Sequence, residues 1–330
     1  MAKGKHRALK VTGVILGVIV GLALIAVVAL NLYIKVGFAS FYNRTEIKGD
    51  VPGLSTGFVP QDMDHVTADG SWVFSGYMAD GSPSPLFHRK ADGTVQTLYV
   101  EMPDGTTYAD HGSGVTSNEE FLYLTCDHGY LLIPMDDLVF AEDGQTLKAT
   151  ERVDLEFSPA FLNIEENQLL TGEFYYPSDY ETPESHRITT PDGTENPAVM
   201  YSYPQDATNP GHFSTVPDSV FSIPGMVQGT CRLNENQLVL STSYGIAPLH
   251  LLVYDTNLGY PDGTYVTDAG DEVALYCLDS RNLALDVAGP PMLEGIDDYD
   301  GLVYTCDEAA SNKYIFGKLY GASKLYAVSL

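Results

Sequence analysis

The chain has 330 residues, of which 44 are acidic and 17 are basic, and its formal net charge is −27. A surface this acidic repels phosphate backbones and anionic headgroups, so nucleic acid is excluded as a partner, whereas cations and cationic partners remain open. The acidic residues all follow Arg44, and six of the basic residues precede Thr45, so the negative charge belongs to the C-terminal part of the chain. The same acidity also keeps a domain soluble, whatever it binds.

The N-terminal segment is first basic and then apolar. Four basic residues lie in 1–10, and an uncharged run follows from Val11 to Ile34. About 20 helical residues cross the hydrocarbon core of a bilayer, whereas a signal-peptide core has about 7 to 15 and precedes small residues at its cleavage site. We therefore expect an uncleaved signal anchor in the cell membrane, with the basic end in the cytoplasm. The predicted parts are a cytoplasmic basic tail (1–10), a transmembrane helix (11–34), a juxtamembrane linker (35–44) and an extracytoplasmic domain (45–330).

Three glycines recur at every fourth position of the predicted helix, at Gly13, Gly17 and Gly21. This spacing puts them on one helix face, where small residues allow a second helix to approach closely. A homodimer through this face is one interpretation. The other is that glycine is simply frequent in transmembrane helices.

The segment 45–330 repeats one pattern five times: a small residue, a polar turn, and a run that favours strands and ends in Ser, Thr, Gly or Cys. Apolar and polar residues alternate between Gly, Pro, Asn and Asp, which predicts strands throughout. Each repeat supplies about four strands, and radial repetition of four-stranded units is the β-propeller architecture. We therefore predict an all-β domain, a five-bladed β-propeller. The repeats begin at Val59, His111, Ser158, Val227 and Leu293.

The two ends of the domain complete one blade. The last repeat has three strands, and Thr45–Asp50 resembles the outer strands that precede the other repeats. Bare edge strands are avoided in natural sheets. We therefore expect Thr45–Asp50 to pair with Lys324–Leu330 and close the ring.

Two repeats are longer than the others and predict insertions, between Phe174 and Pro217 and between Asp255 and Glu272. Long loops on a rigid scaffold carry recognition in many folds, but they are also tolerated as decoration, so the role of 174–217 stays open. The four cysteines are too few and too far apart to form a disulfide framework, and they are expected to be buried. The first insertion is rich in tyrosine, at Tyr175, Tyr176, Tyr180, Tyr201 and Tyr203.

Four short segments carry a resemblance to known proteins: VQG (227–229), STSYG (241–245), PPMLEG (290–295) and EAASNKY (308–314). Over 45–330 the chain resembles uncharacterised bacterial β-propeller proteins that are membrane-anchored or secreted, and more distantly the lactonase-like propellers. The resemblance implies a propeller and no particular activity.

Lactonase-like propellers hold a divalent cation on their axis, and the resemblance offers Glu294 and Asp62 as ligands for it. The equivalent positions in the other repeats are Ser113, Ala160 and Gln228. These side chains do not complete the oxygen shell of six or more ligands that calcium prefers. We therefore predict no metal and no cofactor, with an axial divalent cation as the less favoured alternative.

Residues at equivalent places in successive repeats lie at the same height around a propeller axis. The sequence therefore predicts that five polar residues converge at one end of the channel, where they bind a small ligand or only water. The predicted ligand-binding residues are Gln61, Asp62, His111, Gln228 and Glu294.

Two classes of function remain open. The leading interpretation is a membrane-anchored binding module for a ligand or protein of unknown specificity. The alternative is an extracytoplasmic hydrolase, lactonase-like or glycosidase-like, whose axial carboxylates meet in one pocket at separations that set the stereochemistry. No nucleophile elbow is present, so catalytic residues are not assigned and enzyme activity stays undecided. The carboxylates considered for hydrolysis are Asp62, Asp127, Glu173, Glu294 and Asp307.

Overall fold

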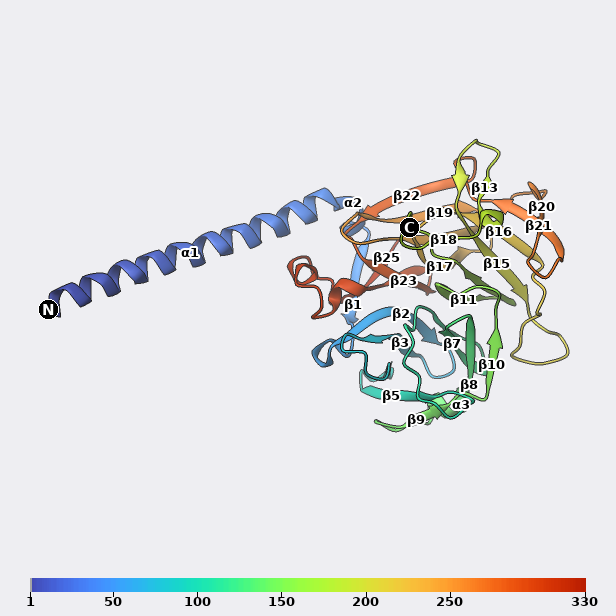
Figure 1. Ribbon diagram of the computed structural model, residues 1–330, viewed down its shortest axis with the longest axis horizontal. Helices are drawn as coiled ribbons and strands as arrows, with labels where there is room; N and C mark the ends of the chain where they lie inside the picture. The colour runs from blue at the N-terminus through green and yellow to red at the C-terminus, as the bar shows by residue number, and fades with distance from the viewer. Residues whose placement is uncertain (1) are drawn as a thin grey trace.

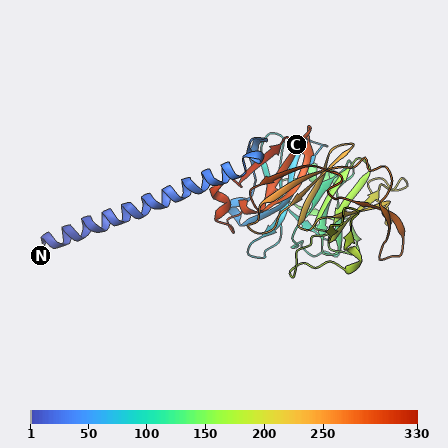
Figure 2. The ribbon, with the colours of Figure 1, turned by 90° about the horizontal axis from the view of Figure 1, so that it is seen from above.

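The computed structural model describes residues 2–330, and Met1, the first residue of the predicted basic tail, lies outside the described part. One long helix, α1 (Ala2–Gly37), leads into a ring of β-sheets that contains most of the remaining chain (Figure 1). The view turned by 90° shows the same helix standing clear of the ring (Figure 2). The predicted five-bladed β-propeller with one N-terminal apolar helix is confirmed.

Helix α1 contains a segment that is long and apolar enough to cross a membrane, Lys10–Gly37, and its most apolar window of 18 residues has a mean hydropathy of 3.0. The ring covers none of its most apolar window. Large apolar side chains such as Leu16 and Ile25 are therefore exposed by 63% and 66%, which is unfavourable in water and favourable in lipid. A signal sequence can share this position and composition. The helix is therefore a candidate membrane span.

Five innermost strands surround the channel of the propeller. They are β2 (Phe58–Val66), β6 (Val115–Ser117), β11 (Phe161–Glu165), β17 (Val227–Asn234) and β23 (Leu293–Tyr299). Each lies against the innermost strand of the next blade, and β23 lies against β2, so the ring is closed.

Behind each innermost strand, three further strands follow in antiparallel order. In blade 5 a tight turn connects the innermost strand to the second strand; its residues Asp300 and Gly301 have φ angles of 54° and 73°, as a type I′ hairpin requires. The outer strands of blades 1 to 5, in order, are β3 (Ser71–Met78), β4 (Leu86–Arg89) and β5 (Val95–Glu101); β7 (Phe121–Cys126), β8 (Gly129–Pro134) and β10 (Glu151–Asp154); β12 (Gln168–Gly172), β15 (Ala198–Pro204) and β16 (Ser219–Ile223); β18 (Gln237–Thr242), β19 (Leu249–Asp255) and β22 (Leu283–Gly289); and β24 (Leu302–Asp307), β25 (Lys324–Val328) and β1 (Thr45–Asp50).

The first and last strands of the domain close the ring, as predicted. Strand β1 pairs antiparallel with β25, from Thr45 opposite Val328 to Asp50 opposite Lys324. Lys324 Nζ also donates to Asp50 Oδ1 at 2.5 Å. Blade 5 is therefore built from both ends of the domain: β25 is paired on both sides, and β1 is the outermost strand of the blade.

The structure corrects the predicted extent of the first insertion. Strand β15 is the regular third strand of blade 3, although it lies within 174–217, and its residues Tyr201 and Tyr203 are buried in the core. The inserted chain is instead divided between the connection from β12 to β15 and the loop from β15 to β16. The prediction was wrong here because aromatic residues in a strand are indistinguishable by composition from those of a tyrosine-rich loop.

The second insertion leaves its own blade. It leads from β19 of blade 4 to β20 (Gly263–Val266) and β21 (Glu272–Cys277), and β21 pairs in parallel with β16 of blade 3. Blade 1 gains β9 (Thr146–Lys148), parallel to β5. Remaining short elements are α2 (Ala39–Tyr42), α3 (Met135–Val139), the hairpin β13 (Ile188–Thr189) and β14 (Glu195–Asn196), and the 3-10 helices η1 (Leu54–Thr56), η2 (Glu184–His186), η3 (Glu308–Ala310) and η4 (Phe316–Leu319).

Within residues 35–44, predicted as a linker, the short helix α2 packs against the propeller. Phe41 of α2 is fully buried among apolar side chains of blades 4 and 5. The Tyr42 hydroxyl donates to the carbonyl of Tyr320 at 3.1 Å. Helix α1 is therefore connected to the propeller through a short helix that packs against blades 4 and 5.

Apolar side chains fill the spaces between adjacent blades. The four cysteines are free and buried in these layers, as expected. Burial raises the pKa of the Cys126 thiol to about 11, so this residue behaves as a small apolar side chain. The cysteines are Cys126, Cys231, Cys277 and Cys306.

Candidate functional site

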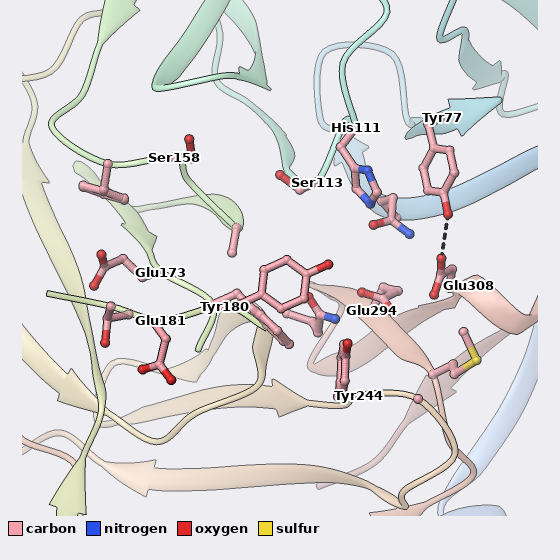
Figure 3. Close-up of a pocket in the computed structure, with 18 of the residues that line it drawn as sticks. Tyr77, His111, Ser113, Ser158, Glu173, Tyr180, Glu181, Tyr244, Glu294 and Glu308 are labelled. Atoms are coloured by element: carbon pink, nitrogen blue, oxygen red, sulfur yellow. Dashed lines mark hydrogen bonds between the residues drawn. The ribbon is translucent and has the colours of Figure 1, made fainter. Parts of the chain in front are cut away.

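A cavity of about 950 Å³ opens at the face of the ring where the innermost strands begin and the second strands end. All five blades contribute side chains to its wall, several of which are labelled in Figure 3. Its size suits a small organic ligand. The lining includes Gln61, Tyr77, His111, Ser113, Glu156, Ser158, Ala160, Glu173, Phe174, Tyr180, Glu181, His186, Gln228, Tyr244, Asp268, Glu294, Glu308, Lys313 and Tyr314.

Four of the five predicted residues line this cavity: Gln61, His111, Gln228 and Glu294. Three of them lie at irregularities in the pairing of an innermost strand with its neighbour. Gln61 and Gln228 are the extra residues of bulges in β2 and β17, and Glu294 lies in the shifted segment of β23. A bulge interrupts the ladder and redirects a side chain, which is common beside functional sites.

Asp62 does not line the cavity, and its assignment is corrected. The bulge at Gln61 shifts β2 by one residue, and successive side chains of a strand point to opposite faces. Asp62 is buried, and its Oδ2 accepts the N–H of Val115 in blade 2 at 2.8 Å. Burial raises the pKa of Asp62 well above its usual range. Asp62 therefore connects blades 1 and 2, and a Cβ at Gly295 would collide with its carboxylate.

Glu294 is the buried carboxyl group of the cavity. Glu294 is 4% exposed. Its backbone carbonyl accepts a hydrogen bond from Ser241 Oγ at 2.7 Å. No hydrogen-bond donor within residues 2–330 reaches its side-chain carboxyl group. Burial, followed by the charges of Glu308, Asp307 and Asp62, raises the pKa of Glu294 well above its usual range. A buried carboxyl without a partner is unfavourable. Glu294 therefore keeps its full hydrogen-bonding capacity for a ligand.

The cavity wall beside this carboxyl combines an acid, two tyrosines and a lysine. The hydroxyls of Tyr77 and Tyr314 both donate to Glu308 Oε1 at 2.9 Å. Lys313 Nζ donates to the Tyr77 hydroxyl at 2.6 Å and lies 4.9 and 5.2 Å from the ring centroids of Tyr77 and Tyr314. The His111 ring stacks on Tyr77 with centroids 4.3 Å apart, and burial and then Lys313 lower its pKa. This wall already holds an ammonium group against aromatic faces.

An aromatic cluster lies next to this wall. Tyr244, from the loop after β18, has its ring centroid 4.0 Å from Tyr176, 5.7 Å from Phe174 and 6.1 Å from Tyr180. The last three residues come from the chain that follows β12. The first insertion thus contributes to the cavity, and it presents flat apolar surfaces there.

Two acids on the other side of the cavity already have partners. Glu173 Oε2 lies 2.8 Å from His186 Nδ1, and both residues are buried. Glu181 accepts a hydrogen bond from Arg187. Figure 3 shows Glu173 and Glu181 across the cavity from Glu294. The wall is acidic on both sides, and Glu294 is the buried acid of this wall that has no hydrogen-bond partner among residues 2–330.

The other end of the axis holds four acidic residues that the sequence analysis missed. Burial is the main cause that raises the pKa of Asp64 to about 6 and that of Glu165 to about 9, and the charge of Asp298 adds to both shifts. Asp62 and Asp64 are two residues apart on β2, so a search for acids in the alternating pattern of an innermost strand would have found part of this group. We call Asp64, Glu165, Asp297 and Asp298 the acid cluster.

The acid cluster joins neighbouring blades. Asp297 Oδ2 of blade 5 accepts the N–H of His65 in blade 1 at 2.8 Å. Glu165 Oε1 of blade 3 accepts the N–H of Arg232 in blade 4 at 2.7 Å. An innermost strand is the edge of its sheet, so part of its backbone N–H groups have no partner within the blade. The cluster supplies these partners from the next blade.

The axial cation of lactonase-like propellers does not fit these residues, because Asp62 faces a backbone N–H group. In the described part of the chain, no group of three or more His, Cys, Asp or Glu residues is placed to hold a metal ion. Among the carboxylates considered for hydrolysis, Glu173 and Glu294 line the cavity. Asp127 is exposed, and Asp307 accepts the N–H of Ala309 at 2.8 Å.

No protein-family model matches the chain, and no curated protein matches it by sequence. Among solved structures, it is similar to the PQQ-bound aldose sugar dehydrogenase of Streptomyces coelicolor, with 13% identity and a TM-score of 0.45 over 80% of this chain and 78% of that one. A glucose dehydrogenase-type oxidoreductase of Thermus thermophilus has 10% identity and a TM-score of 0.44, over 86% and 99%. The WD40 propeller domain of Doa1 has 10% identity and a TM-score of 0.43, over 87% of each chain. Likeness at this level carries no argument about function.

Proposed function

We propose that this protein is a single-pass membrane protein whose propeller stands outside the cytoplasm and binds a small ligand in the cavity. The observation that carries the proposal is Glu294, a buried carboxyl group without a hydrogen-bond partner among residues 2–330, in a cavity built by all five blades. Gln61 and Gln228 support it. Their amide nitrogens donate to the carbonyls of Pro60 and Ser243 at 3.0 and 3.4 Å, which leaves the amide oxygens as acceptors.

Ligand binding is tested by thermal melting of the full chain in detergent against a panel of sugars, lactones, amines and carboxylic acids. The control is the variant Ala160→Phe, in which a larger side chain narrows the cavity. Each compound is tested on the wild type and on this variant. A ligand of the cavity stabilises the wild type in proportion to its occupancy and leaves the variant unchanged. Equal stabilisation of both proteins would place the binding elsewhere.

The proposed topology rests on the charge around the candidate span. Four basic residues precede Val11, and the acids all follow Arg44, so the positive-inside rule places the propeller outside. Protease added to intact cells should remove the propeller. A mature protein that begins near residue 40 in the medium would contradict an uncleaved anchor.

A homodimer through α1 is part of the proposal. Cβ atoms built at Gly13, Gly17 and Gly21 meet no atom within 4 Å, so this face is open to a second helix. Replacing Gly17 by Leu should reduce cross-linking between full-length copies in membranes. Unchanged cross-linking would show that the three glycines do not form a dimer interface.

The alternative function is an extracytoplasmic hydrolase. Its support is that Glu173 and Glu294 face one cavity, as a glycosidase-like acid and nucleophile or base would require. Glu173 already has a hydrogen-bond partner in His186, however. This leaves it less available as a catalytic acid or base, so a binding function is favoured. Turnover of aryl glycosides or lactones that is lost in both Glu173→Gln and Glu294→Gln would establish the enzyme.

A further inference from the structure

The charge of the cavity wall restricts the ligand class. Six acidic side chains line the cavity, against one lysine, Lys313, and no arginine. A concave wall with this excess of carboxylates attracts cations and repels anions. An acidic wall alone does not make a site, but this one also contains Glu294, which is 4% exposed and whose carboxyl group has no hydrogen-bond donor within the described residues 2–330.

The surroundings of Glu294 suit an ammonium group. A charged N–H donor makes a stronger and shorter hydrogen bond to a carboxylate than a neutral donor does. Gln61 and Gln228 line the same cavity, and an amide oxygen can accept ammonium protons. The chain itself shows that this wall accommodates an ammonium, because Lys313 Nζ lies over the rings of Tyr77 and Tyr314.

The middle and the far side of the cavity suit an extended cation. The rings of Tyr180 and Tyr244 offer apolar faces, on which methylene groups pack and which attract cations. Glu173 and Glu181 lie across the cavity from Glu294 (Figure 3). Both already have protein partners, so a second ammonium group gains less there than the first gains at Glu294.

We infer that the cavity binds a linear organic polyamine, one ammonium group of which pairs with Glu294. The methylene chain crosses the rings of Tyr180 and Tyr244. The second ammonium group faces Glu173 and Glu181. This inference rests on the proposed function, because it assigns a ligand class to the same cavity.

The test is titration calorimetry of the full chain in lipid nanodiscs with four probes of equal length. These are hexamethylenediamine, the amino alcohol with one amine, the neutral diol, and the dicarboxylate adipate. The diamine should bind most tightly and the amino alcohol second, and the diol and adipate should not bind. In Glu294→Gln, both amines should bind about tenfold more weakly, since the charge-assisted hydrogen bond is lost.

Three further variants separate site binding from adsorption on the acidic surface. Lys313→Met removes the competing cation and should strengthen diamine binding several-fold, whereas an anionic ligand would be weakened. Tyr244→Ala removes a half-buried ring outside the core and should weaken the diamine about threefold. Glu272→Gln changes an exposed acid on β21 and should have no effect. Melting curves establish that each variant is folded.

The outcomes are decisive for this ligand class. One outcome is that the diol or adipate binds as tightly as the diamine and loses this binding in Ala160→Phe. That result would overturn the polyamine as the ligand class and would still place the binding site in the cavity. Diamine binding that is equal in wild type, Glu294→Gln and Tyr244→Ala would be surface adsorption and would overturn the inference. Absence of binding by all four probes also overturns it, while the broader melting panel still decides the proposed function separately.

Discussion

The two ends of the propeller axis both bury acidic side chains, but they use them differently. Where the innermost strands finish, Asp297 and Glu165 accept backbone N–H groups of the next blade at 2.8 and 2.7 Å. Where the strands begin, Glu294 is equally buried and has no donor among residues 2–330. The same residue type holds the ring together at one end and stays available to a ligand at the other.

The difference follows from the backbone. At the finishing end β2 and β23 pair regularly with their neighbours, and β17 carries a second irregularity between Arg232 and Asn234. The acids there lie opposite N–H groups of the next blade. At the beginning, β2, β17 and β23 each carry a pairing irregularity, at Gln61, Gln228 and Glu294. Bulges redirect side chains away from the ladder. Polar residues there face the cavity instead of a neighbouring strand.

Removing β25 should destabilise the whole propeller, including the acidic sites at both ends of its axis. This is the largest expected effect. Deletion of residues 324–330 leaves β1 without a partner strand and β24 as a bare edge, so blade 5 loses the pairing that joins the two ends of the domain. We expect the cooperative thermal transition of the propeller to disappear. A truncated chain that still melts cooperatively would show that the ring does not depend on this closure.

Asp62→Ala should destabilise the propeller by about 2 kcal/mol, because the buried N–H of Val115 loses its acceptor. For a domain of this size, that lowers the melting temperature by about 5 °C. The matched variant Asp62→Asn keeps an acceptor oxygen and should lose less. Equal losses in the two variants would assign the effect to the negative charge and not to the hydrogen bond.

The acid cluster should make the propeller less stable as pH rises. The pKa of Glu165 is raised from 4.5 to about 9 in the folded protein, so its contribution is fully present below pH 4.5 and is lost as pH rises toward about 9. The slope from one such group is at most about 1.4 kcal/mol per pH unit. Unfolding in urea between pH 5 and pH 9 measures it.

Glu165→Gln provides the comparison for this pH dependence. The amide keeps an acceptor for the N–H of Arg232 and cannot ionise, so the decline of stability with pH should flatten. Glu272→Gln, on the surface, should leave the slope nearly unchanged. If both variants flatten it equally, the slope reflects general charge repulsion and not the acid cluster.

Glu294→Gln should have the smallest effect on folding. No protein hydrogen bond to the carboxyl group is lost, and the amide avoids burying a charge, so the free energy of unfolding should change by less than about 1 kcal/mol or rise slightly. Thermal melting at pH 7 measures this. A loss as large as that of Asp62→Ala would show that Glu294 is structural after all, and the contrast between the two ends would fail.

The sequence by itself determined the architecture. Five copies of one strand pattern predicted five blades, and the unpaired segment Thr45–Asp50 predicted its own partner in the last blade. Both features are local: alternation with a period of two predicts strands, and turn pairs such as Asp300–Gly301 predict where they reverse. The free backbone N–H and C=O groups of an edge strand then have few possible partners. The apolar helix before the propeller was evident for the same reason, since its composition alone marks it.

Only the tertiary structure decided which side chains meet. A single extra residue at Gln61 moved Asp62 out of the cavity, and a bulge changes register without leaving a trace in residue types. Strand β21 crossed from its own blade to β16 of the previous one, because that edge was open. Glu165 and Asp297 converge from blades 3 and 5, far apart in sequence. Such contacts depend on how distant segments pack, and local patterns, which set strands and turns, contain no information on that packing.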